Sequence, residues 1–369
     1  MNYLYRIMVI VLLFASSVKA ENIFIDPQDG YLDASRWLFE HSGFLPVPIV
    51  ITEPAVGFGL GVALVFMDKS HDKPREGHFA PPTVKGLGGF GTENGSRGAF
   101  GFYIKNWDED RWRYMGAVAG VGMNLDFYGA AGFPGKNQKF AYDLDGFFIV
   151  QDIRRRLGES NFFAGLRYIY SDLKTELENA GPLLSGLENE NKNGGLSVLL
   201  IYDSRDNTMS PLSGAQVTLN YNSYSESLGG DLNYQIGSLD AQYFWKWSEL
   251  WGGAFRLLGK WSTGGVPFYA KPFIDVRGIA KQRYQGDYAL SSELEFRYHL
   301  HPRWQVSVFG GGGKAVTDTS YLDGSETAGT YGAGFRYLIA RLVGFQMGLD
   351  IAQGPEETVF YIQAGSAWF

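Results

Sequence analysis

Two groups of residues in this sequence have types and spacing that could support chemistry. The first is a short segment that contains His71, Asp72, Glu76 and His78. Imidazole and carboxylate groups are common metal ligands, so this segment could bind a metal ion. Clustered charges are also typical of a solvated loop, which is the interpretation that we favour. The sequence therefore predicts no metal and no other cofactor.

The second group is a serine and a histidine on one face of an alternating stretch. Ser291 and His299 share this face with Glu293 and Glu295. A histidine can activate a serine as a nucleophile, so a membrane-embedded hydrolase is one interpretation. A histidine near acids is more often part of a polar network, and we do not expect an enzyme. The chain has no cysteine, which excludes thiol nucleophiles and disulfides.

The element that positions these side chains is predicted to be a long β-strand. One face is polar and comprises Asp287, Ser291, Glu293, Glu295, Arg297 and His299. The other face is apolar and comprises Tyr288, Leu290, Leu294, Phe296 and Tyr298. A half-exposed soluble sheet also alternates. Alternation over this length, with aromatic rings at the ends of the apolar face, is typical of a strand between lipid and a polar lumen.

The composition supports a barrel built from such strands. The chain contains 22 Tyr, 27 Phe, 9 Trp and 49 Gly, yet its mean hydropathy is slightly negative. Outward apolar and inward polar faces cancel in such an average. After residue 20, no apolar run reaches the ~20 residues that a spanning helix needs. The predicted fold is therefore all-β, a transmembrane antiparallel β-barrel in a bacterial outer membrane.

The number of strands follows from the pattern and from barrel geometry. Fifteen stretches are predicted to be strands, and the first of them is residues 54–67. Bacterial single-chain barrels have an even number of strands. We therefore predict sixteen strands, with the missing one in the aromatic, glycine-rich residues 111–138.

The N-terminal part is predicted to contain an export signal and a short leader. Residues 1–20 have a basic n-region, an apolar run and a small-residue cleavage site, as a secretory signal peptide does. Residues 21–52 are the predicted leader, and residues 53–369 are the predicted barrel. Residues 31–41 of the leader could form an amphipathic helix. Such a helix could plug or cap the barrel, or the leader could be a tail.

The charge balance bears on the partners of the exported chain. Cleavage after Ala20 removes Arg6 and Lys19, so Lys plus Arg falls from 32 to 30 against 39 acids and the net charge becomes −9. Nucleic-acid binding needs basic patches that displace counterions. Nucleic acid is therefore not a predicted partner, whereas outer-membrane lipid is.

Three motifs go beyond a general barrel pattern. The first is a tight turn whose marked residues are Asp203, Arg205, Asp206, Asn207, Pro211 and Gly214. The second is Val276-Arg277-Gly278-Ile279, inside a long loop before the cleanest strand. The third is the C-terminal alternating segment, in which the candidate barrel signal comprises Phe360, Ile362, Trp368 and Phe369.

In this order and spacing, the motifs resemble those of the BamA/TamA superfamily of outer-membrane insertases and two-partner secretion transporters, also called the bacterial surface antigen family. The resemblance is clear from about residue 190 to the C-terminus and is only general before that. It implies a sixteen-stranded barrel that aids outer-membrane assembly or translocation of protein or lipid. A periplasmic or outer-membrane protein is a further candidate partner.

The resemblance also implies a loop that folds back into the lumen and is held there by an arginine. By resemblance, Arg277 and Gly278 belong to this loop, and Glu295 is the wall glutamate that pairs with the arginine. We call this pairing the lumen latch. The alternation independently places Glu295 on the polar face. In the alternative interpretation, Arg277 is a surface arginine of an outer loop.

The sequence departs from the family pattern in two places. The next strand of family members carries an aspartate after its aromatic residue, whereas Phe309 is followed by residues 310–313, which are all glycine. The latch is therefore expected either to be weaker or to use Glu293 as its further acid. Insertases of the family also carry periplasmic POTRA domains, which residues 21–52 are too short to hold. The chain thus resembles a barrel-only branch, and a passive or gated pore or a structural outer-membrane protein is the alternative function.

Overall fold

The computed structural model describes residues 23–40, 44–68, 83–128, 139–177, 189–317, 325–366 and 368. The predicted signal peptide, the candidate metal group at residues 71–78 and Phe369 lie outside these ranges. In the described part of the chain, no helix is long and apolar enough to cross a membrane.

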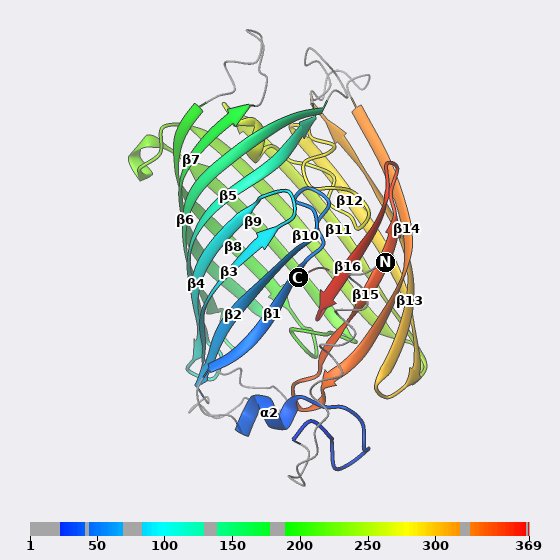
Figure 1. The fold of residues 1–369 in the computed structure, drawn as a ribbon. Helices are drawn as coiled ribbons and strands as arrows, with labels where there is room; N and C mark the ends of the chain where they lie inside the picture. The colour runs from blue at the N-terminus through cyan, green and yellow to red at the C-terminus, as the bar shows by residue number, and fades with distance from the viewer. Residues whose placement is uncertain are drawn as a thin grey trace.

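Sixteen antiparallel strands form one continuous sheet that curls into a barrel (Figure 1). Strands that follow one another in the sequence are neighbours in the sheet. The strands are β1 (Phe44–Ile51), β2 (Gly59–Asp68), β3 (Thr83–Thr92), β4 (Arg97–Trp107), β5 (Trp112–Tyr128), β6 (Lys139–Arg156), β7 (Phe162–Leu177), β8 (Asn189–Asp203), β9 (Gly214–Tyr224), β10 (Tyr234–Lys246), β11 (Trp251–Gly264), β12 (Tyr288–His301), β13 (Trp304–Val316), β14 (Ser325–Ala340), β15 (Phe345–Gln353) and β16 (Thr358–Ala364). The predicted all-β, sixteen-stranded antiparallel barrel is confirmed.

Side chains alternate between the two faces of the wall. In β12, Glu293 and Glu295 are each 2% exposed, whereas Leu294 between them is 38% exposed. On the outer faces of β13 and β14, Val308 and Tyr331 are 58% and 68% exposed. Apolar side chains this exposed suit a wall that faces lipid, while the buried acids line a polar lumen.

The barrel begins earlier in the chain than the sequence predicts. β1 covers Phe44–Ile51, so the predicted boundary at residue 53 is wrong. The predicted place of the missing strand is also wrong, because Trp112–Tyr128 form one long strand, β5. Pro46 and Pro48 conceal β1 in the sequence, since proline is tolerated in a strand only at an edge, at its start or at a bulge.

The leader packs against one end of the barrel, which we call the leader end (Figure 1). Its helix, α2 (Ser35–Glu40), is shorter than the predicted one. Tyr337, in the outward-facing phase of β14, donates a 2.7 Å hydrogen bond from its hydroxyl to the Leu32 carbonyl. The rings of Tyr31 and His301 lie 4.8 Å apart. The described leader therefore lies against the rim of the wall.

The sheet has two free edges. Its order runs from β1 to β16, and within the described strands the two edges do not pair with each other. The two strands nevertheless lie beside each other in the wall (Figure 1). We call this boundary, where no hydrogen-bonded ladder joins the wall, the seam.

Candidate functional site

The candidate site is built by the loop between β11 and β12, residues 265–287, which folds back into the barrel. Its buried apolar side chains pack against small residues on the inner wall, and the cluster comprises Ile274, Val276, Ile279, Ala289, Ala315 and Ala328. Small wall residues leave room for the loop, and burial of the loop's branched side chains favours its inward position. We call this segment the lumen loop.

Arg277 of the lumen loop is surrounded by three carboxylates of the wall. Its Nε donates to Glu293 Oε1 at 2.9 Å, and its two Nη atoms donate to Glu295 Oε2 and Asp350 Oδ2, each at 2.7 Å. The backbone N–H of Arg277 also donates to Glu293 Oε2 at 3.1 Å. All four side chains are at most 5% exposed. We call these four residues the Arg277 cluster.

Two further arginines balance the charge of the cluster. Arg297 donates from Nε to Glu295 Oε1 at 2.7 Å, and Arg336 donates from Nη2 to Asp350 Oδ2 at 2.9 Å. Three arginines thus face three carboxylates. Buried charges are costly unless they are paired and hydrogen-bonded, and here every carboxylate has at least one guanidinium partner. The arrangement can therefore hold the loop against the wall.

Phe309, the aromatic residue of β13, contacts Arg277. The further carboxylates that bind Arg277 come from β12 and β15. The Arg277 guanidinium lies over the Phe309 ring, 3.5 Å from its centroid, in cation–π geometry. Glu293 contacts Arg277, which is one of the two alternatives that the sequence left open. Asp350 of β15 was not predicted as a partner. Alternation places Asp350 on the inner face, but it does not give the height at which this side chain meets the loop.

Gly278 occupies a position where a side chain would not fit easily. Its φ is +94°, and a Cβ there would lie 3.3 Å from atoms of Ala352, Gly354 and Thr330. Its N–H donates to the Tyr361 hydroxyl, on β16, at 2.9 Å. Glycine adopts this left-handed conformation without steric cost. The loop thereby comes close to one of the two strands at the seam.

The C-terminal segment also reaches the Arg277 cluster. β16 ends at Ala364, and Gly365, with φ +81°, turns the chain away from the wall. Trp368 donates from its indole Nε1 to Glu293 Oε1 at 2.6 Å, and its ring lies 5.9 Å from that of Phe244. Trp368, a residue of the expected C-terminal signal, therefore lies on the lumen side.

Phe360 and Ile362, the other described residues of the expected C-terminal signal, lie within β16. They are 63% and 39% exposed and face outward. The alternating C-terminal strand is thus present, but it is shorter than the sequence motif.

The turn motif forms a compact structure between β8 and β9. Asp203 pairs with Arg205, whose Nε lies 2.9 Å from Oδ1. Asp206 Oδ1 accepts the Leu212 N–H at 3.0 Å, and Asn207 Oδ1 accepts two further backbone N–H groups. Gly214 has φ +100°, and a Cβ there would collide with the Ser204 carbonyl. The side chains of the motif thus satisfy the backbone of the turn itself.

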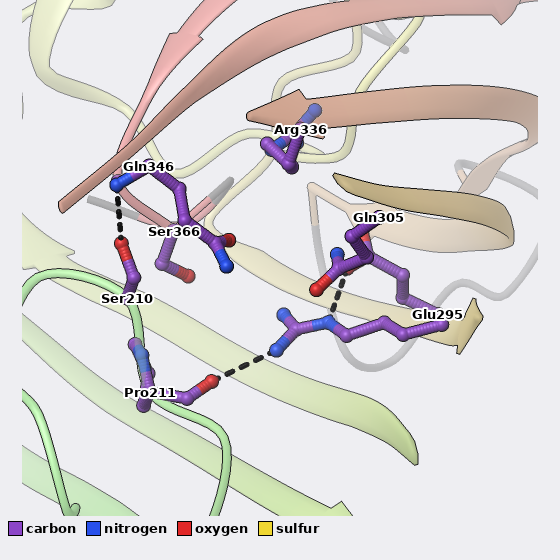
Figure 2. Close-up of a pocket in the computed structure, with 9 residues that line it drawn as sticks. Ser210, Pro211, Glu295, Gln305, Arg336, Gln346 and Ser366 are labelled. Carbon is purple, nitrogen blue, oxygen red and sulfur yellow. Dashed lines mark hydrogen bonds and ion pairs between the residues drawn. The ribbon is translucent and has the colours of Figure 1, made fainter. Parts of the chain in front are cut away.

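This turn also contacts the neighbours of the Arg277 cluster. Arg297, which pairs with Glu295, donates from Nη1 to the Pro211 carbonyl at 2.8 Å. Ser210 Oγ accepts the Gln346 N–H at 3.1 Å, and Ser366 N–H donates to the Met209 carbonyl at 2.7 Å. Figure 2 shows the small polar pocket between these segments, with Ser210 beside Gln346. The turn motif and the C-terminal segment, which are far apart in the sequence, therefore meet in the lumen.

The structure does not bring the serine and the histidine of the hydrolase interpretation together. They are eight residues apart on β12, which corresponds to about 27 Å along an extended strand. Ser291 Oγ accepts the Asp275 N–H at 2.9 Å, so this hydroxyl helps to seat the lumen loop. Among the described residues, no group of three or more His, Asp or Glu side chains is placed to hold a metal ion.

A second arginine cluster, which was not predicted from the sequence, joins the leader to the rim. Arg303, in the turn between β12 and β13, is 2% exposed. Its guanidinium donates to Asp26 and Asp33 at 2.5 Å and to Asp29 at 2.6 Å. Arg341 also donates to Asp26, and this hydrogen bond is the main cause that lowers the pKa of Asp26 to about 2. We call these five residues the Arg303 cluster.

The spacing of the leader aspartates could have indicated a binding role for them. Asp26, Asp29 and Asp33 lie close together in the sequence. Nothing in the sequence pairs them with Arg303, which follows more than 260 residues later. This cluster could be found only from the structure.

Comparisons with known proteins agree with this architecture. Residues 83–340 match the Omp85 superfamily domain. Among solved structures, the chain is similar to BamA from Haemophilus ducreyi lacking POTRA domains 1–3, with a TM-score of 0.60 and 12% identity over 88% of this chain and 70% of that one. No curated protein is similar enough in sequence to match.

The chain is also similar to two CdiB structures. CdiB from Escherichia coli gives a TM-score of 0.60 at 12% identity, over 86% of this chain and 61% of that one. CdiB from Acinetobacter baumannii gives 0.55 at 12% identity, over 86% and 59%. At this identity the similarity concerns the fold, and the chain spans about three fifths of the length of either CdiB.

Proposed function

The chain belongs to the Omp85 superfamily, and from that premise we propose that it assists the insertion or translocation of a polypeptide or lipid at the outer membrane. The family and the barrel fold indicate an outer-membrane protein of the insertase and transporter type. The proposed step beyond this is that cargo passes at the seam.

The observation that carries the proposal is a seam without a ladder, bridged from inside by the lumen loop. On one side of the seam, Gly278 N–H donates to Tyr361 of β16. On the other side, Lys281 N–H donates to Glu53 Oε1 at 3.1 Å, in the turn that follows β1. Barrels usually remove their edges by closure, because free edges invite pairing with other chains. The conduction of solutes alone does not require a wall in which two neighbouring strands are unpaired.

In this proposal the Arg277 cluster is the lumen latch. It fixes the loop to β12 and β15, while the residues that follow Arg277 contact Tyr361 of β16 and Glu53 in the turn after β1. Release of Arg277 would free the loop and remove its contacts with Tyr361 and Glu53. The state of the latch would therefore be coupled to the freedom of the seam.

We also propose that residues 1–20 direct export and that the leader end faces the periplasm. Turns on the periplasmic side of outer-membrane barrels are typically short, and the described turns at the leader end are short as well. A periplasmic protein partner would then meet the chain at this end. N-terminal sequencing of the mature protein tests the export signal, and we expect the mature chain to start at Glu21.

Deletion of the gene, followed by an inventory of outer-membrane proteins and lipids, tests the proposed function. Loss of one class of barrel protein, one secreted protein or one lipid would support assembly or translocation. An unchanged membrane with altered solute uptake would contradict it and would favour a passive or gated pore. Complementation with the wild-type gene is the control.

A further inference from the structure

The leader contains a tight hairpin, residues 24–33, which we call the leader hairpin. Asp26 N–H donates to the Tyr31 carbonyl at 2.9 Å, and Ile25 lies opposite Leu32 in an antiparallel bridge. Residues opposite each other in an antiparallel pair have their side chains on the same face, and their neighbours along the chain point the other way. Ile25 and Leu32 therefore share one face of the hairpin.

The two faces of the leader hairpin differ in polarity. Asp26 and Asp33 are each 4% exposed and accept hydrogen bonds from Arg303. Ile25 and Leu32, on the other face, are 37% and 50% exposed. In a hairpin surrounded by water, the apolar side chains would pack inward and the aspartates would face the solvent. The leader hairpin has the reverse arrangement, so its exposed face fits an apolar neighbour.

The place of the leader hairpin on the rim indicates what this neighbour is. The carbonyl of Leu32 accepts a hydrogen bond from the hydroxyl of Tyr337. Tyr337 belongs to an outward aromatic group at this end of the wall, in which the Trp304 ring lies 4.5 Å from Tyr337 and 5.0 Å from Phe335. Outward rings at the end of a barrel wall mark the boundary between hydrocarbon and water. The apolar face of the hairpin therefore continues the lipid-facing wall at this boundary.

The neighbouring rim adds further exposed apolar side chains. Leu342, in the short helix η5 (Arg341–Val343) between β14 and β15, is 56% exposed, and its N–H donates to Ser35 Oγ at 3.0 Å. Tyr31, whose ring lies against His301, is 40% exposed. Apolar side chains gathered at one place on a surface mark contact with a membrane or with another protein. Continuity with the lipid-facing wall favours the membrane.

We propose that the leader hairpin is a membrane-interface anchor. Arg303 holds its acidic face against the rim, and its apolar face enters the headgroup region of the phospholipid around the barrel. An amphipathic segment in such a position buries its apolar face about 5–10 Å into the boundary between headgroups and acyl chains. Unpaired carboxylates would be unfavourable there, and Arg303 and Arg341 pair the aspartates of the hairpin. This inference depends neither on a cargo nor on the seam, so it can fail independently of the proposed function.

Fluorescence quenching tests this placement on the purified full chain in phospholipid nanodiscs, in which both membrane surfaces are accessible. The chain has no cysteine, so Leu32→Cys and Gln28→Cys each introduce a single site for an NBD label. Gln28, exposed near the tip of the same hairpin, is the matched control. The two quenchers are a phospholipid with a nitroxide on its headgroup and iodide in the water.

The two positions should respond in opposite ways. We expect the label at position 32 to lose most of its emission to the nitroxide lipid and little to iodide, because its face of the hairpin is apolar. The label at position 28 should lose more to iodide, because the tip is polar. Equal quenching patterns at the two positions would overturn the proposal. Strong iodide quenching at position 32 would also overturn it and would favour a protein partner on this face.

Replacement of Arg303 tests what holds the hairpin in place. We expect Arg303→Ala to lower the nitroxide quenching at position 32, because the unpaired aspartates would then oppose entry into the headgroup region. Arg111→Ala, at an exposed turn of the same end of the barrel, is the matched control and should leave the quenching unchanged. Unchanged quenching in Arg303→Ala, with heat-modifiable mobility in gels showing a folded barrel, would contradict the role of Arg303.

Discussion

The two arginine clusters of this protein share their chemistry but differ in where they lie and in what they join. Arg277 and Arg303 each bind three carboxylates through nearly buried guanidinium groups. The Arg277 cluster lies in the lumen and joins a loop to the wall. The Arg303 cluster lies at the rim and joins the leader, which precedes β1 in the sequence, to the turns beside β13 and β14.

The comparison shows that both clusters hold parts of the chain together across the seam. The lumen loop touches β16 and the turn after β1, while the leader connects the β13 side of the rim with β1. Neither cluster replaces the missing ladder, but each limits how far the two edges can separate. The lumen cluster is charge-balanced by Arg297 and Arg336, whereas the rim cluster has three aspartates and two arginines. We therefore expect them to respond differently to mutation and to pH.

The largest effect is expected from charge reversal in the lumen. Arg277→Glu would leave four acids together in a buried site, and removal of one partner of a buried ion pair already costs about 3–5 kcal/mol. We expect the loop to leave the wall, with raised conductance in planar bilayers and higher vancomycin sensitivity of cells.

Arg111→Glu, at an exposed turn, is the matched control for charge and should behave like the wild type. Wild-type conductance and sensitivity in Arg277→Glu would contradict the role of this cluster as a latch.

A smaller effect, confined to the leader, is expected at the rim. Arg303→Ala removes the shared partner of Asp26, Asp29 and Asp33, so we expect the leader to detach while the barrel stays folded. Limited proteolysis should then cleave the leader faster, with unchanged gel mobility of the heated and unheated barrel. Arg341→Ala removes only the contacts with Asp26 and should give an intermediate rate. Equal protection of the leader in the wild type and both variants would contradict the role of the Arg303 cluster in holding the leader.

Loss of the glycine conformation in the lumen loop should have a more modest effect. Gly278→Ala places a Cβ at φ +94° and in tight contact with the wall, and we expect about 1–2 kcal/mol of destabilisation. Chemical unfolding in detergent measures this difference. Gly265→Ala, where a Cβ meets nothing within 4 Å, is the control and should be close to neutral. Equal effects at the two positions would show that the left-handed conformation is not needed.

The smallest effect is expected on acidification below about pH 4, and it should appear at the rim. The pKa of Asp26 is lowered from 3.8 to about 2 by its hydrogen bond with Arg341. A lowered pKa stabilises the docked leader above pH 4, and this contribution is lost as the pH falls from about 4 to 2. A fluorophore attached to Leu32→Cys should report release of the leader in that range. Release that begins well above pH 5 would contradict this assignment.

Much of the wall could be predicted from the sequence because its signal is local. Period-two alternation places Glu293, Glu295 and Asp350 on the inner face without any knowledge of the fold. The strand β1 escaped prediction because Pro46 and Pro48 argue against a strand everywhere except at an edge. Whether a segment is an edge depends on the whole sheet, so no local pattern can decide it.

The sequence by itself determined the barrel, its strand number and the inward or outward direction of most side chains. Only the tertiary structure decided which inward side chains meet. Asp350 reaches Arg277 across 73 residues, and Asp26 reaches Arg303 across 277. These contacts depend on the height of each residue in the wall and on the path of the loops. Both are set by the stagger of sixteen strands together, and alternation along any one strand contains no information about them.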